Sequence, residues 1–87
     1  MLVREVIDSV DKNTKIQVID TYNRNTFVEQ AYLDDIKTSK RTVQIKYFRN
    51  INTDMEQKYH DKLLNSKAID VIVRDDNSTV ITTQVQF

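Results

Sequence analysis

The chain has 87 residues and a formal net charge of zero, with 39% apolar and 30% charged residues. This length predicts one domain with a thin core, and this composition is too apolar for a disordered chain. Cysteine, glycine and proline are absent, which excludes disulfides, cysteine-ligated metals and glycine-rich phosphate loops.

The sequence also predicts a protein of the cytoplasm. It contains no apolar run of 18 residues that would span a bilayer. Residues 1–5 do not combine a basic region with an apolar stretch, so they do not resemble a secretory signal. We therefore expect no membrane association, and we treat residues 1–87 as a single domain.

The first part of the chain predicts one helix followed by two strands. Apolar residues recur at helical spacing over residues 2–10, and β-branched residues alternate with polar ones over 15–22. Residues 23–25 fit a hairpin loop because asparagine tolerates a left-handed backbone, and a second strand is expected over 26–32. Residues 33–40 are polar and indicate a turn.

A third strand and a second helix are expected next. Apolar and polar residues alternate over 41–49, which predicts a half-buried strand. Thr53 and Glu56 have the spacing of a capping box, in which the two side chains satisfy free amides at a helix start, and they predict a helix over 54–66. The expected apolar stripe of this helix consists of Met55, Tyr59, Leu63 and Leu64.

The end of the chain predicts a β-hairpin. Residues 68–74 and 79–87 are rich in β-branched side chains, and the four polar residues 75–78 separate them. The terminal strand 79–87 also suits edge-to-edge pairing with a second copy, so a homo-oligomer is one alternative.

Together these elements predict an α+β domain in the order α-β-β-β-α-β-β. The alternatives are a mainly antiparallel five-stranded sheet with two helices packed on it, and a small curled barrel. Because glycine is absent, turns that need a positive φ must use Asn or Asp. The sequence supplies these residues at Asn23, Asn25, Asp75, Asp76 and Asn77.

No pattern in the sequence predicts catalysis or a cofactor. His60, the single histidine, precedes Asp61 in the expected second helix, where adjacent side chains do not face each other. We expect an exposed histidine without a catalytic partner, with a pH-sensing contact as the alternative. No serine is flanked by a base and an oxyanion loop, so we expect a non-enzymatic protein.

Two acidic pairs, Asp34-Asp35 and Asp75-Asp76, are the densest carboxylate groups. Neither is followed by the ligand spacing and terminal Glu of a calcium loop. We therefore expect turn or cap residues rather than a metal site. The same pairs also suit a basic groove on a protein partner, so they are candidate binding residues.

Charge is distributed unevenly along the chain. Residues 37–49 carry +5, whereas 1–36 sum to −3 and 50–87 to −2. Basic residues interleaved with aromatic ones are typical of sheets that bind single-stranded nucleic acid, although a net charge of zero argues against that partner. A protein-binding surface, and a solvated strand with Tyr47 in the core, are the alternatives. The candidate binding residues here are Lys37, Lys40, Arg41, Lys46, Phe48 and Arg49.

Residues 2–8, 14–20 and 63–73 resemble small accessory proteins encoded by phages and prophages of low-GC Gram-positive bacteria. That group includes inhibitors of host defence nucleases such as anti-CRISPR proteins. The resemblance implies a small non-enzymatic protein in the cytoplasm of a bacterial host cell that acts by stoichiometric binding to a protein partner. It assigns no site residues.

Overall fold

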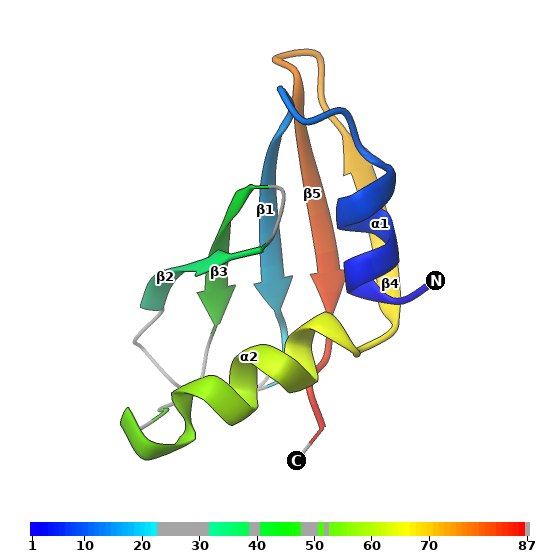
Figure 1. Cartoon of the computed structure of the whole chain (residues 1–87). Coiled ribbons are helices and arrows are strands. Elements are labelled where there is room, and N and C mark those ends of the chain that lie inside the picture. The colour runs from blue at the N-terminus through cyan, green and yellow to red at the C-terminus, as the bar shows by residue number, and fades with distance from the viewer. Residues whose placement is uncertain (23–31, 39–40, 48–50, 52, 87) are drawn as a thin grey trace.

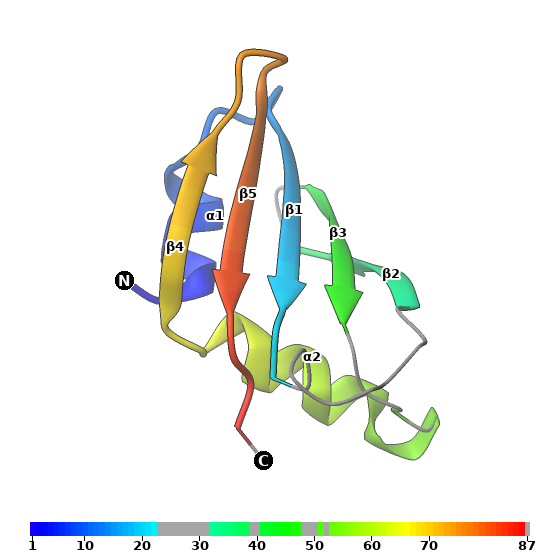
Figure 2. The same ribbon diagram turned by 180° about the vertical axis from the view of Figure 1, so that it is seen from behind.

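The computed structural model describes residues 1–22, 32–38, 41–47, 51 and 53–86. Within them, two helices and five strands form an α+β domain, as the sequence predicts (Figure 1). Both helices lie on one side of the sheet, which leaves the other side without helices (Figures 1 and 2). The elements are α1 (Val3–Ser9), β1 (Lys15–Asp20), β2 (Tyr32–Lys37), β3 (Thr42–Tyr47), the 3-10 turn η1 (Thr53–Met55), α2 (Glu56–Leu64), β4 (Ala68–Val73) and β5 (Ser78–Thr83).

The sheet is mixed, with the strand order β2-β3-β1-β5-β4. β1 pairs in parallel with both β3 and β5, and only the outer pairs β2–β3 and β4–β5 are antiparallel. Parallel neighbours need a long crossover rather than a hairpin, and α2 lies in the connection from β3 to the β4–β5 hairpin. The expectation of a mainly antiparallel sheet is therefore wrong, and so is the barrel alternative, because β2 and β4 are the two edges of an open sheet.

The neighbours of β1 in the sheet are β3 and β5, so the strand order differs from that of the hairpin predicted between residues 15–22 and 26–32. The loop residues 23–25 and residues 26–31 lie outside the described residues. Tyr32–Lys37, most of which was expected to be a turn, is instead the edge strand β2. An edge strand needs only one buried face, and in the part of β2 whose burial is described Ile36, 5% exposed, is buried between the exposed Asp35 and Lys37.

The core lies between the helices and the sheet. Alternate residues of β1 and β3 face the helices, as the period-two pattern of the sequence predicts. Each such side chain, when fully buried, contributes about 1.5–3 kcal/mol to the free energy of unfolding. The buried apolar residues of the main cluster are Val3, Val6, Ile7, Ile16, Val18, Ile36, Val43, Ile45, Tyr59, Leu63, Ile81 and Val85.

The second helix begins later than its predicted capping box. Thr53 starts the 3-10 turn η1, α2 begins at Glu56, and no side chain caps its first amides by hydrogen bonding. The tighter winding of a 3-10 turn takes Met55 out of line with the apolar stripe, and its side chain is 38% exposed. The buried stripe consists of Tyr59 and Leu63, with Leu64 partly buried beside them.

The predicted terminal hairpin is confirmed, with β4 and β5 antiparallel. Asn77 has φ 63°, the left-handed conformation expected of an asparagine turn without glycine. Strand β5 ends at Thr83 and lies between β1 and β4. The exposed edge of this hairpin is therefore β4, and β5, part of the strand 79–87 that the sequence offered for pairing with a second copy, is an interior strand.

Neither α1 nor α2 has the length and apolar composition needed to cross a membrane, and the same holds for the rest of the described chain.

Candidate functional site

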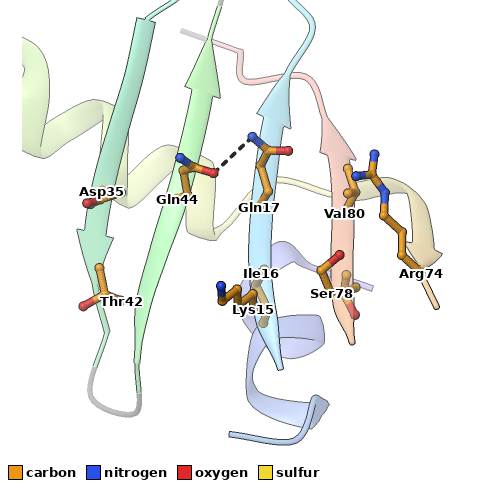
Figure 3. A pocket seen from close by; sticks show the side chains of 10 residues that line it. Lys15, Ile16, Gln17, Asp35, Thr42, Gln44, Arg74, Ser78 and Val80 are labelled. Atoms are coloured by element: carbon orange, nitrogen blue, oxygen red, sulfur yellow. Dashed lines mark hydrogen bonds between the residues drawn. The ribbon is translucent and has the colours of Figure 1, made fainter. Parts of the chain in front are cut away.

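The helix-free face of the sheet contains a hollow of about 330 Å³. Because side chains alternate along each strand, Gln17 of β1 and Gln44 of β3 both project onto this face, where Gln17 Nε2 donates a hydrogen bond to Gln44 Oε1 at 3.3 Å (Figure 3). The lining of the hollow comes from both halves of the sheet and consists of Lys15, Ile16, Gln17, Asp35, Thr42, Gln44, Arg74, Ser78, Thr79 and Val80. Residues distant in sequence thus share one polar surface.

Charged side chains surround this hollow. Lys15, Asp35 and Arg74 are exposed and line it (Figure 3). Val80, by contrast, is only 5% exposed and gives the hollow an apolar floor. In the described part of the face basic residues outnumber acidic ones, as the register shows: Lys15, Lys37, Lys46 and Arg74 against Asp35 and Asp70.

Arg41, a candidate binding residue of the basic segment, has a structural position. Its Nη2 donates to the carbonyl of Val10 at 2.5 Å, and its Nη1 donates to the carbonyl of Thr14 at 3.1 Å. Val10 is the C-cap residue of α1, where carbonyl groups lack helical partners and a positive charge is favourable. Arg41 therefore fixes α1 and the loop after it to the start of β3.

Two further residues of the basic segment, Lys37 and Lys46, project onto the helix-free face. Lys37 is exposed in β2, and Lys46 is half-buried in β3. Tyr47 faces the helices, where its ring centroid lies 5.2 Å from that of Tyr59, so the interpretation of Tyr47 as a core residue agrees with its packing. Lys40, Phe48 and Arg49 lie outside the described residues.

The two acidic pairs lie at opposite edges of the sheet. Asp34 and Asp35 belong to β2, so their expected role as turn or cap residues is wrong. Asp75 and Asp76 form the β4–β5 turn, as predicted. The Ser78 hydroxyl donates a hydrogen bond to Asp76 Oδ1 at 2.5 Å and lowers the pKa of that carboxyl from its ordinary value. No group of three or more His, Cys, Asp or Glu side chains able to hold a metal ion occurs in the described part of the chain.

Asp20 is a buried polar residue that the sequence reasoning missed. It is 1% exposed, and its Oδ2 accepts a hydrogen bond from the Tyr59 hydroxyl at 2.8 Å. Its Oδ1 accepts from the backbone amides of Tyr22 at 3.0 Å and Val85 at 3.2 Å. A signal was present, because Asp20 is in phase with the buried residues Ile16 and Val18. The carboxyl group links β1, α2 and the segment after β5.

His60 is not the exposed histidine that was expected. Its side chain is 14% exposed, and its Nε2 lies 4.0 Å from Glu56 Oε1, one helical turn away. Asp61, the neighbour in sequence, accepts a hydrogen bond from Gln57 Nε2 at 3.2 Å. His60 and Asp61 therefore contact different groups.

The edge strand β4 is the second surface that stands out. Its side chains after Ala68 are exposed although most of them are apolar: Ile69 is 58% exposed, Val71 42%, Ile72 49% and Val73 76%. Large apolar side chains grouped on a surface are typical of interaction sites.

The chain matches no protein family, no curated protein and no solved structure with which it was compared.

Proposed function

We propose that this chain is a non-enzymatic protein-binding module, and that the hollow on the helix-free face is its binding surface. The supporting observation is that charged and hydrogen-bonding side chains from β1, β2, β3 and β5, with Arg74 after β4, line one hollow. The helices bury the opposite face and leave this one accessible (Figures 1 and 2). A rigid sheet presenting polar groups suits recognition of a folded partner surface.

The charge of the face indicates the chemistry of the partner. Lys15 and Arg74 are exposed at the hollow, with Asp35 the acidic residue of its lining. Gln17 and Gln44 offer further donors and acceptors between them. We infer a protein surface with an excess of carboxylates, because complementary charge speeds association and excludes partners of the wrong charge.

A nucleic-acid partner has less support than a protein partner. Two of the residues that suggested it have other roles, since Arg41 binds carbonyls near the end of α1 and Tyr47 packs against Tyr59. The context inferred from sequence resemblance, a phage or prophage accessory protein that inhibits a host defence system, remains part of the proposal. It would place the acidic partner in the cytoplasm of a low-GC Gram-positive bacterium.

Site-specific photo-crosslinking tests the proposed surface. Gln44, exposed at the hollow, is replaced by benzoylphenylalanine, and exposed Lys58 on α2 is replaced in a matched control. We expect one discrete protein adduct in lysate of a low-GC Gram-positive bacterium from position 44 and none from position 58. Unlabelled wild-type chain should compete for the adduct, and Lys15→Glu should compete about tenfold less well.

Two results would contradict the proposal. Equal adducts from positions 44 and 58 would mean that the helix-free face is not the binding surface. An adduct that disappears after nuclease treatment would identify nucleic acid, rather than protein, as the partner.

A further inference from the structure

The free part of the β4 edge is short and well defined. The amide of Ala68 donates to the carbonyl of Met1 at 2.8 Å, and Leu2 forms an antiparallel bridge with Lys67, so the N-terminal segment covers the beginning of this edge. Beyond Ala68, as far as the turn at Asp75, no strand among the described residues pairs with this edge. Its midpoint is Ile72. Exposed apolar edges of this kind are templates for pairing with another strand.

The hydrogen bonds of the hairpin show which backbone groups of β4 point outward. The amide of Arg74 donates to the carbonyl of Ser78 at 2.8 Å, so the backbone groups of Arg74 face β5. In an antiparallel pair every second residue directs its backbone groups toward the neighbouring strand. The backbone groups of Ile72 and Asp70 therefore face β5 as well. The amides and carbonyls of Val71 and Val73 therefore point away from the sheet.

These outward groups restrict how a second copy of β4 can pair with the first. In an antiparallel pair, outward-facing residues must lie opposite each other. If Val71 lies opposite Val73 of the second copy, Ile72 lies opposite its own equivalent on a two-fold axis. The outward-facing amides and carbonyls of Val71 and Val73 in each copy then pair with those of the other copy. The two copies contact each other through identical surfaces, as two-fold symmetry requires.

The same register brings opposite charges together. Asp70, Ile72 and Arg74 share the helix-free face of the strand, because they alternate along it. With Ile72 on the axis, Asp70 of each copy lies opposite Arg74 of the other. Shifting the register by two residues loses this match, since Asp70 would then face either Asp76 or Ile72 of the second copy. Opposite charges directly across a strand pair are stabilising, and like charges are destabilising.

We propose that the protein forms a two-fold dimer by antiparallel pairing of β4 with β4 of a second copy, centred on Ile72 and flanked by two Asp70–Arg74 ion pairs. The two sheets become continuous, and their helix-free faces lie side by side. Such a short ladder buries less surface than a standard interface, so the dimer dissociates reversibly at micromolar concentration. This dimer does not depend on the proposed protein partner, because it is measured on the purified chain.

Sedimentation equilibrium of the full chain, from low micromolar to near-millimolar concentration, tests the dimer. Asp70 and Arg74 are both exposed, so substitutions there leave the core intact. Asp70→Lys places a lysine opposite Arg74 twice, and Arg74→Glu places a glutamate opposite Asp70 twice. We expect each variant alone to dimerise at least about tenfold more weakly than wild type. Lys37→Glu, on the opposite edge strand, is the matched control and should dimerise as wild type does.

Mixing the two variants tests the register itself. In a heterodimer of D70K with R74E, the introduced lysine of one chain meets the introduced glutamate of the other, and the unchanged Arg74 meets the unchanged Asp70, so both ion pairs are restored. We expect the mixture to associate with nearly wild-type affinity although neither variant does so alone. A wild-type chain that is monomeric at every concentration would overturn the proposal, and would leave β4 as an edge for a different protein. Failure of the mixture to associate would overturn it as well, because the strands would then pair in another register.

Discussion

Asp20 is the buried polar residue on which three parts of the chain converge. Its two oxygens accept hydrogen bonds from the Tyr59 hydroxyl and from the amides of Tyr22 and Val85. The residue is 1% exposed, so its carboxyl group has almost no contact with bulk solvent. Unsatisfied buried groups cost more than the net value of the hydrogen bonds that they replace. We therefore interpret Asp20 as the residue that fixes α2 and the segment after β5 against β1.

We expect Asp20→Ala to lower the free energy of unfolding by about 3 kcal/mol, because it leaves the Tyr59 hydroxyl and two amides without their acceptor. Tyr59→Phe removes one donor and should cost about 1 kcal/mol. Urea unfolding of both variants and of the double variant gives the coupling between the two side chains. Losses that simply add in the double variant would contradict the direct hydrogen bond, and Asp75→Ala in the exposed turn is the control.

Asp76 provides a prediction on pH. The Ser78 hydroxyl bond holds the pKa of Asp76 below its ordinary value of 3.8. A carboxyl group whose pKa is lower in the folded chain than in the unfolded chain stabilises the fold at pH values above the unfolded-state pKa. This stabilisation is lost as the pH falls through the folded-state pKa. We expect Ser78→Ala to raise the pKa of Asp76 toward 3.8, measured by carboxyl NMR titration. Ser9→Ala, whose hydroxyl instead donates to the Val6 carbonyl, should leave the pKa unchanged. If both variants titrate like wild type, the Ser78 bond does not cause the shift.

At the scale of elements, α1 is a short helix whose position depends on contacts outside it. Its N-terminal side is held by the Glu5 carboxylate, which accepts a hydrogen bond from the Leu2 amide at 2.9 Å. Beyond its C-terminal end, Arg41 binds the carbonyls of Val10 and Thr14. A helix of 7 residues is not stable in isolation, so these contacts and its three buried residues decide whether it forms.

We expect Arg41→Ala to destabilise the protein by roughly 1–2 kcal/mol, a value kept low because the residue is half-buried. Arg41→Lys should recover only part of this loss, since one ammonium group does not reproduce the planar fork that reaches two carbonyls. In the Arg41→Ala variant, amide hydrogen exchange should accelerate more in α1 than in β1. Lys37→Ala, at an exposed position, is the control and should leave hydrogen exchange unchanged. If Arg41→Ala accelerated exchange equally in α1 and throughout the sheet, the result would argue against a local role for Arg41.

The strand predictions differ in outcome for a local reason. β1 and β3 have buried faces that impose a period of two on the sequence, and both strands were predicted close to their bounds. The edge strand β2 presents Asp35 and Lys37 to solvent and buries Ile36 between them. Its polar sequence resembles a turn, because an edge strand lacks a second neighbour that would favour apolar residues.

At the scale of the whole molecule, the sheet topology decides which residues meet. Placing β5 between β1 and β4 turns the terminal strand into an interior one and exposes β4. The same arrangement gathers Lys15, Gln44 and Arg74 around one hollow, although long segments separate them in sequence. The proposed protein-binding face and the proposed dimer edge are both consequences of this strand order.

The sequence by itself determined what depends on neighbouring residues. The helical period placed both helices, and alternation or β-branched content placed β1, β3, β4 and β5. The absence of glycine pointed to Asn or Asp for left-handed turns, and Asn77 has that conformation. Only the tertiary structure decided the parallel pairing, the exposed edge, and the partners of Arg41 and Asp20. The physical reason is that local patterns specify which face of a strand is buried, whereas strand order and long-range hydrogen bonds depend on the combined packing of segments far apart in the chain.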